Sequence, residues 1–549
     1  MPDPAHQHPP TDFYDLCTRP WIPVSTGDRT SCVGLCEFFL RAHEFSGLAV
    51  ALPPAASGLH RILCAMAARI TGLDTAAGGD DWQGRRFELL DSGVGFDPEQ
   101  VRAYFREHAD GLRLHDPVRP FLQDPRLVEE CPSSSGVNKL VLARPAGNNL
   151  VFFGHFMDSE QVPLPSQEAV LHLIAQLYYG PSGQCTPRVV GGERSGNTMA
   201  GPLRRVLSTH PVGPTLFDTL LMGIPEPAAW PSPHQDSLPD GCPWERATLP
   251  NPRDLPTAAG GPLSLLTEQS QHAVLLQPGP SGDEVIDATI TWALRVNRPP
   301  APDPYLIWDT LKDGTPRPRD ARAERALWRD LDALVLMRRA DGGRRPLILN
   351  GLSGFLPDRV ADQLRVAAYG FDQDGQTRDR TYFSAITPPL FALLTSSGPG
   401  HDNALALGVK EGREAAEKAA WHLATALRSV WRSYTTPFTD EVRSGGAGSQ
   451  AGADGGGSKK SKHPGPWPEA ALAAYWPAAE ERFWNLLHAG DFSASLRVFG
   501  ALALEIYDGT TAQVAASPRG ARARETARGL VRTLVHKPRD PSAPTDRPH

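Results

Sequence analysis

The stretch Trp421-His-Leu-Ala-Thr-Ala-Leu-Arg-Ser-Val-Trp431 repeats its large apolar side chains at the period of an α-helix. Four consecutive segments near the end of the chain share this amphipathic pattern: 409–433, 468–488, 492–507 and 510–536. Four such helices in succession are typical of a four-helix bundle, in which each apolar stripe faces a shared core. The sequence therefore predicts a bundle over residues 386–540.

Helical and strand patterns are mixed in the part of the chain that precedes the bundle. From Leu59 to Ile70 the apolar residues recur at helical spacing, which predicts an amphipathic helix packed on a core. Strand-like alternation follows later in the same part. We therefore predict an α+β fold, with a large mixed domain over residues 13–385 followed by the bundle.

The clearest strand signal is an alternation that ends near residue 296. Together with residues 272–277 it predicts a β-hairpin whose second strand buries Ala288, Ile290, Trp292, Leu294 and Val296. Because successive side chains of a strand point to opposite faces, Thr289, Thr291 and Arg295 should lie on the more exposed face.

Composition marks the segments that we expect to lie outside these cores. The chain has 549 residues with 51 glycines and 54 prolines, which indicates many loops. The polar, proline-rich residues 1–12, the Gly/Ser-rich insert 443–466 and residues 541–549 are predicted to be disordered. We expect a cytoplasmic protein without a membrane span, since no apolar run approaches the ~20 residues that a bilayer requires.

Charge is informative only locally, because the formal net charge of −7 gives no basic signal for the whole chain. Residues 312–345 hold ten basic and six acidic side chains, which indicates either a solvated helix face or a phosphate-contacting surface. The last predicted helix and its end carry seven basic residues against Glu525, and the same two interpretations remain open there.

A glycine-rich stretch, Arg188-Val-Val-Gly-Gly-Glu-Arg-Ser-Gly-Asn-Thr-Met-Ala-Gly201, follows a predicted helix and lacks hydrophobic periodicity. Glycines let a backbone approach a ligand closely, and exposed N–H groups beside arginine suit phosphate or base edges. The stretch is therefore predicted to be a contact loop, with an ordinary surface loop as the alternative.

Motifs for catalysis or metal binding are missing from the sequence. The seven cysteines are scattered without a CxxC pair, so we interpret them as buried reduced thiols and expect no zinc. The P-loop, the dinucleotide fingerprint, the nucleophile elbow and the HExxH pattern are all missing. We therefore expect neither an enzyme nor a bound cofactor.

The order of these features resembles a known family, the large (CasA-type) subunit of the type I-E CRISPR Cascade complex. The resemblance rests on short motifs that follow one another in the family's order and extend over nearly the whole chain. They are Trp21-Ile-Pro-Val24, Leu114–Gln123, Gly136-Val-Asn-Lys-Leu140, Gly191–Gly196, a predicted turn over Gly370–Gln376 and the four C-terminal helices.

The resemblance implies which residues contact DNA. In the family a glycine loop enters the minor groove beside the protospacer-adjacent motif, and Gly191 and Gly192 are the matching positions. The groove is only about 6 Å wide, so a backbone without side chains fits where a larger residue does not. Arg188 and Arg194 are then expected to hold the loop through phosphate contacts.

The other expected contacts also follow from the resemblance. A wedge that starts strand separation matches Gly375 and Gln376, and the mobile loop over residues 134–149 matches a nucleic-acid contact through Asn138 and Lys139. The basic residue of the family's groove-reading hairpin matches Arg295, with Arg298 as the neighbouring alternative. Arginines on the last helix are expected to contact the displaced strand or the duplex: Arg522, Arg524, Arg528 and Arg532.

The function implied is that of a non-enzymatic subunit of an RNA-guided antiviral complex, which recognises the flanking motif and starts R-loop formation. Its partners would be double-stranded target DNA, the guide RNA-containing subunits (backbone, small and guide-handle-binding) and a helicase-nuclease. Two alternatives from other classes remain: a nucleotide-dependent hydrolase in which Gly191–Gly196 cradles phosphate, and a scaffold without nucleic-acid contact.

Overall fold

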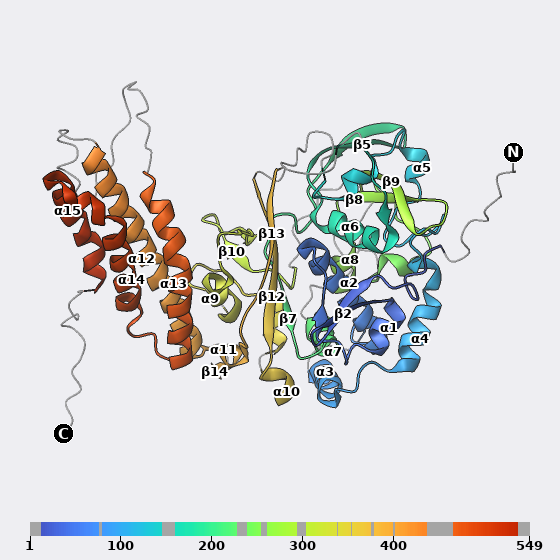
Figure 1. Cartoon of the computed structure of the whole chain (residues 1–549). Helices are drawn as coiled ribbons and strands as arrows, with labels where there is room; N and C mark the ends of the chain where they lie inside the picture. The colour runs from blue at the N-terminus through green and yellow to red at the C-terminus, as the bar shows by residue number, and fades with distance from the viewer. Residues whose placement is uncertain are drawn as a thin grey trace. The chain divides into compact units, whose positions relative to one another are not determined.

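The computed structural model describes residues 13–75, 80–144, 157, 160–227, 239–253, 261–268, 270–293, 303–337, 339–352, 354–374, 378–398, 401–435 and 465–535. The chain forms two compact units, Met1–His401 and Asp402–His549 (Figure 1). The division between them falls between His401 and Asp402, whereas the sequence analysis placed it after residue 385.

The core of the first unit is built around one long helix, α2 (Pro53–Thr71). It packs against α6 (Ser166–Tyr179), α7 (Leu216–Gly223) and strand β12 (Arg365–Asp374). The predicted apolar stripe is buried, but so is nearly every other side of the helix, including the polar residues Ser57, His60 and Arg61. α2 is therefore a central helix of this unit, not a helix with one solvated face.

Shorter helices complete the first unit. They are α1 (Leu35–Leu40), α3 (Asp80–Ser92), α4 (Pro98–Glu107), α5 (Leu127–Glu130), α8 (Pro262–Thr267), α9 (Leu331–Val335), α10 (Asp358–Ala361) and α11 (Phe391–Leu394). Single 3₁₀ turns lie between them: η1 (Ala109–Leu112), η2 (Val137–Leu140), η4 (Pro243–Glu245), η5 (Leu327–Asp330) and η6 (Leu347–Leu352).

The strands of the first unit pair antiparallel in small separate sheets. Three-stranded sheets have the orders β2-β1-β3, β13-β12-β7 and β4-β9-β8, and two-stranded ones are β5-β6, β10-β11 and β14-β15. The bounds are β1 (Ile22–Thr26), β2 (Arg29–Val33), β3 (Gly47–Leu48), β4 (Leu164–Pro165), β5 (Gly183–Val190), β6 (Glu193–Thr198), β7 (Ser208–Val212), β8 (His272–Pro278), β9 (Glu284–Trp292), β10 (Trp308–Thr310), β11 (Pro316–Pro318), β13 (Arg378–Ile386), β14 (Ser396–Gly398) and β15 (His401–Asp402).

The predicted β-hairpin is confirmed as β8–β9, with Ala288, Ile290 and Trp292 buried, whereas Leu294 and Val296 lie outside the described residues. The prediction that Thr291 lies on an exposed face is wrong, because this residue is fully buried. Its Oγ1 donates a hydrogen bond to the carbonyl oxygen of Thr186 (2.6 Å) in β5. The β5–β6 hairpin therefore covers the second face of β9.

A long hairpin, β12–β13, occupies the segment that the sequence analysis read as a turn over Gly370–Gln376. Gly370 is instead a strand residue paired with Phe383. A side chain at Gly370 would place its Cβ 2.5 Å from the Phe383 ring, so close packing explains this glycine. Gly375 and Gln376 lie outside the described residues.

Within the described part of the basic stretch 312–345, the α-helix α9 is buried and does not form a solvated face. Asp309 accepts ion pairs from Arg319 (2.6 Å) and from Arg339, and Asp330 accepts them from Arg319 (2.9 Å) and Arg325 (2.7 Å). Much of the local positive charge is therefore neutralised within the fold. The interpretation as a solvated helix face is wrong, and these paired arginines are not available as a phosphate-contacting surface.

The thiols are less buried than the sequence analysis proposed. All seven cysteines are free, but only Cys17, Cys64 and Cys242 are buried. Cys32 is exposed because it lies on β2, the edge strand of its sheet. The prediction of buried thiols is wrong for Cys32.

The second unit is the predicted four-helix bundle, drawn orange to red in Figure 1. Its helices are α12 (Ala404–Thr435), α13 (Trp467–Ala489), α14 (Ser495–Thr510) and α15 (Pro518–Val535). Leu423, Leu427 and Val430 are fully buried, whereas Trp421 is 61% exposed and lies outside the stripe. The last helix begins later than predicted because a 3₁₀ turn, η8 (Ala512–Ala516), precedes it. The predicted disordered insert lies outside the described residues except for its last two positions.

Candidate nucleic-acid interface

The glycine-rich stretch forms a β-hairpin, where the sequence analysis expected a loop. Strands β5 and β6 pair antiparallel, with Val190 opposite Glu193, so Gly191 and Gly192 alone form the turn. Their φ angles are +58° and +79°. Positive φ at both central residues is the requirement of the type I′ turn, which glycine meets without strain.

The tip of this hairpin is open to solvent. Gly191, Gly192, Glu193 and Arg194 are all exposed. A Cβ added to Gly192 would meet no atom within 4 Å, and one added to Gly191 would meet only the Nη1 atom of Arg253, at 3.6 Å. The tip therefore projects as bare backbone that a narrow groove can receive.

Arg188 does not lie on this exposed tip. Its side chain is fully buried, and its guanidinium pairs with Asp124 (2.7 Å) and Glu130 (2.5 Å). It also donates a hydrogen bond to the carbonyl oxygen of Trp292 (3.1 Å) and lies over the Trp292 ring. The prediction that Arg188 contacts phosphate is therefore wrong for this structure, because its charge is directed inward and anchors the hairpin.

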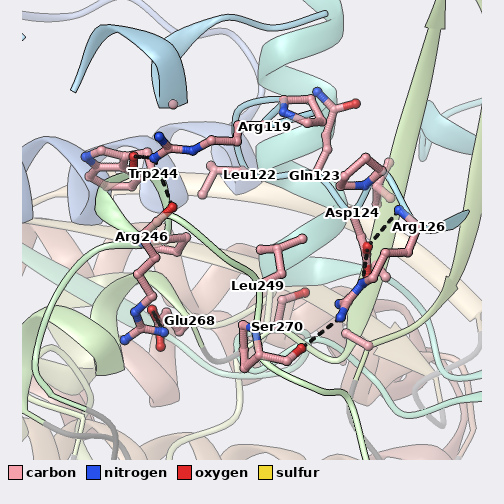
Figure 2. Close-up of a pocket in the computed structure, with 18 of the residues that line it drawn as sticks. Arg119, Leu122, Gln123, Asp124, Arg126, Trp244, Arg246, Leu249, Glu268 and Ser270 are labelled. Carbon is pink, nitrogen blue, oxygen red and sulfur yellow. Dashed lines mark hydrogen bonds and ion pairs between the residues drawn. The ribbon is translucent and has the colours of Figure 1, made fainter. Parts of the chain in front are cut away.

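Asp124 joins the hairpin to a neighbouring segment. Arg126 Nε donates to Asp124 Oδ1 (2.8 Å), and Arg126 Nη1 donates to the carbonyl oxygen of Pro250 (3.0 Å), as Figure 2 partly shows. Burial raises the pKa of Asp124, but the hydrogen bonds of Arg126 and the charge of Arg188 outweigh burial and lower it. The carboxylate therefore stays ionised and holds both segments.

Arg253 is the basic residue beside the tip that the sequence analysis missed. Its Nη2 atom forms an ion pair with Glu193 of β6, and its backbone N–H donates to Asn251 Oδ1 (3.0 Å). Arg253 belongs to a proline- and glycine-rich connection, residues 223–262. No local signal identifies Arg253, because only tertiary packing brings this connection to the hairpin.

The two predicted contact residues Asn138 and Lys139 differ in their exposure to solvent. Both lie in the 3₁₀ turn η2. Asn138 is 1% exposed, and its Nδ2 donates to the carbonyl oxygens of Met157 (3.2 Å) and Glu160 (2.8 Å). The prediction that Asn138 contacts DNA is therefore wrong for this structure, whereas Lys139 is half-buried and keeps access to solvent.

The arginines of the last helix fall into two groups. Arg524 Nη2 and Arg528 Nη2 both pair with Asp508 of α14, each at 2.7 Å. The Arg528 hydrogen bond is the main cause of a lowered Asp508 pKa. Arg522 and Arg532 are exposed, and neither guanidinium has a hydrogen-bond or ion-pair partner in the described part of the bundle. Arg522 and Arg532 are thus the ones available to a phosphate.

Arg295 lies outside the described residues, as do Arg298 and the predicted wedge residues Gly375 and Gln376. Strand β9 ends at Trp292, three residues before Arg295 in the sequence. Strands β12 and β13 end and begin on either side of the wedge positions. These assignments therefore stay predictions from the family resemblance.

A cavity of about 440 Å³, drawn in Figure 2, lies between the segments 118–126, 243–252 and 267–274. Its wall is mainly apolar and includes Leu122 and Leu249, while its arginines bond to the protein itself. Arg119 Nη2, for example, donates to the carbonyl oxygens of Trp244 (3.1 Å) and Arg246 (2.9 Å). Ser270 and His272 both line this cavity, but Ser270 Oγ bonds to the backbone of Leu177 and His272, and His272 Nε2 bonds to the carbonyl oxygen of Pro181 (3.0 Å). The two side chains therefore do not form the nucleophile–base pair of a hydrolase.

The hairpin also does not have the geometry of a phosphate cradle. Such cradles place a glycine loop directly before a helix, whose N-terminus supplies the N–H groups. Here strand β6 follows Gly192, and its residues pair with β5. The structure therefore gives the hydrolase alternative no support at this position.

Separately, no helix in the described ranges is both long and apolar enough to cross a bilayer.

Comparisons with known proteins place this chain in a family. The profile of "CRISPR-associated protein Cse1" matches residues 15–516. A solved chain from a "CRISPR RNA-guided surveillance complex" is 37% identical with a TM-score of 0.80, and the match covers 94% of this chain and 99% of that one.

Two further similarities come from Thermus thermophilus. The curated protein "CRISPR-associated protein CasA/Cse1" is 30% identical over 212 residues, which is 38% of this chain and only 39% of that relative's length. The solved structure of Thermus thermophilus CasA (Cse1) has a TM-score of 0.70 at 20% identity, over 95% of this chain and 99% of that chain, and so shows the same fold. The resemblance found in the sequence is therefore confirmed: the chain belongs to the CRISPR-associated Cse1 family, the large subunit of type I-E Cascade.

Proposed function

We propose that this chain is the non-enzymatic subunit of an RNA-guided antiviral complex that recognises the protospacer-adjacent motif through the DNA minor groove. In this role it starts strand separation and helps to recruit a helicase-nuclease. The observation that carries the proposal is the exposed two-glycine tip of the β5–β6 hairpin. The similar chain solved within a surveillance complex supports the assembly.

The physical argument concerns width and chemistry. The minor groove is about 6 Å wide, and its base edges present acceptors that backbone N–H groups can reach. Gly191 and Gly192 have no side chains to obstruct that approach, and exposed Arg194 follows them on β6. Because minor-groove readout separates base pairs poorly, we expect the subunit to accept several related flanking motifs.

The remaining contacts are assigned by exposure where the structure describes the residue, and otherwise by the family resemblance. Lys139 keeps its proposed contact with nucleic acid, and Arg522 and Arg532 are proposed to bind phosphates of the displaced strand or duplex. Gln376, following Gly375, is proposed as the wedge, and Arg295 as a groove-reading residue. The proposed partners are double-stranded target DNA, the guide RNA-containing subunits and the helicase-nuclease.

The test compares two glycines of matched geometry in the assembled complex. Gly191→Asp places a charged side chain on the tip, whereas Gly27→Asp makes the same change in another two-residue hairpin turn, where φ is also +58°. Gly191→Asp should lower affinity for target duplex by at least ~100-fold, toward non-specific binding. Gly27→Asp should bind as the unsubstituted complex does. Equal affinity for Gly191→Asp would refute the proposal.

A further inference from the structure

A salt bridge lies directly beside the proposed groove-reading tip. Glu193 is the first residue after the turn, its side chain is 74% exposed, and its carboxylate pairs with Arg253. The Nη1 atom of the same guanidinium lies 3.6 Å from the position of a Cβ on Gly191. One edge of Arg253 therefore faces Glu193, while the other faces the turn.

The position of Arg253 is set by the same contacts that hold the hairpin. Asp124 binds Arg188 of β5 (2.7 Å) and also binds Arg126. Arg126 in turn holds the carbonyl oxygen of Pro250, three residues before Arg253. One carboxylate therefore anchors both β5 and the segment that carries Arg253.

The charges of Glu193 and Arg253 affect how the tip approaches DNA. A lone exposed carboxylate at Glu193 would repel the two phosphate backbones that border the minor groove. Arg253 neutralises it, and a guanidinium has five N–H donors, of which one carboxylate uses at most two. Arginine is therefore suited to exchange its carboxylate partner for a phosphate when the tip enters the groove.

We propose that Arg253 is a DNA-contacting residue that binds a backbone phosphate beside the inserted turn, with Glu193 as its counter-ion in the free protein. This inference rests on the proposed function of the hairpin. In this role Arg253 contributes to affinity but not to sequence specificity, because phosphate contacts position the protein on the duplex and do not read bases.

The experiment measures target-duplex binding by the assembled complex over a range of salt concentrations. Each phosphate contact adds about 0.9 to the slope of log K against log salt, so Arg253→Ala should reduce that slope by about 0.9. Over the tenfold change from 1 M to 0.1 M salt, a slope difference of 0.9 corresponds to about eightfold weaker binding at 0.1 M. The loss should be equal for duplexes with different flanking motifs. Arg253→Lys should retain most of the affinity, and Glu193→Gln should strengthen binding to every duplex.

Arg205→Ala is the matched control, because Arg205 is also a partly exposed arginine in an ion pair, with Asp320 (2.9 Å). It should change neither affinity nor slope. Thermal unfolding of the Arg253→Ala chain checks that the fold is intact, and Arg253→Lys tests the contact if it is not. Unchanged affinity and slope for Arg253→Ala, with binding lost in Gly191→Asp, would overturn this inference and leave the proposed function standing. Unchanged binding in Gly191→Asp would instead overturn the proposed function.

Discussion

Replacing Arg188 by methionine tests whether this residue anchors the hairpin or contacts DNA. In the structure its guanidinium is fully buried between Asp124 and Glu130. Removing one partner of a buried ion pair costs about 3–5 kcal/mol, because the remaining charge stays desolvated. Asp124 keeps its bonds to Arg126 at 2.8 and 2.9 Å, so we expect a value near the lower end, ~3 kcal/mol.

Denaturant unfolding of the full chain measures this loss, with Arg205→Ala as the surface control. The Arg205–Asp320 pair is partly exposed, so its removal should cost less than about 1 kcal/mol. Adding Glu130→Gln to Arg188→Met should recover about 1 kcal/mol or more, since it removes a carboxylate left without its partner. Hydrogen exchange should show faster opening of β5 and β6 in the single variant.

The reasoning would be refuted by an Arg188→Met chain that unfolds at the same denaturant concentration as the original. A chain of unchanged stability that nevertheless loses one unit of salt slope in DNA binding would show that Arg188 contacts phosphate. The two roles therefore give opposite results in two independent measurements.

Three further predictions concern the cores and the bundle. Burial lowers the pKa values of four histidines in the first unit, so above pH 6.5 they favour folding, and stability should fall with decreasing pH by up to about 1.4 kcal/mol per unit for each. Unfolding titrations from pH 8 to 5 that stay flat would contradict this. The four are His60 (pKa about 3), His172 (about 4), His272 (about 4) and His210 (well below its usual value). Gly412→Ala should destabilise the bundle by about 1–3 kcal/mol, because its Cβ would lie 2.6 Å from the Phe492 ring. Gly529→Ala, whose Cβ would lie in open space, should stabilise the bundle by about 0.5–1 kcal/mol. Thermal unfolding that ranks the two variants in the other order would show that this packing is wrong. Joint replacement of Arg522 and Arg532 by alanine should reduce the salt slope of DNA binding by about 1.8 at unchanged stability, and an unchanged slope would remove both from the interface.

Hydrophobic periodicity was sufficient to predict the helices and strands that bury one face. The helices of the bundle and the β8–β9 hairpin were predicted because Leu423, Leu427 and Ile290 lie on continuous apolar stripes. Even there the pattern could not distinguish Trp421, which shares the spacing and is exposed. A helical repeat of apolar residues identifies the apolar face of a helix, but it does not show how far neighbouring helices cover the edges of that face.

The candidate site depended on contacts between distant segments, which no local pattern contains. Arg188 is buried because Asp124 and Glu130 come from another part of the chain to meet it. Thr291 is covered by β5, and Arg253 reaches the tip from an irregular connection. The glycines were identified correctly as special positions, since positive φ in a tight turn is a local requirement.

The central claim, that the β5–β6 tip reads the minor groove, is tested most directly by changing one groove of the flanking motif at a time. Replacing guanine by inosine at a G·C pair of the motif removes only the minor-groove N2 amino group, whereas 7-deazaguanine removes only the major-groove N7 acceptor. We predict that inosine changes the affinity of the assembled complex by about tenfold and that 7-deazaguanine leaves it unchanged. Sensitivity to 7-deazaguanine together with indifference to inosine would contradict the account.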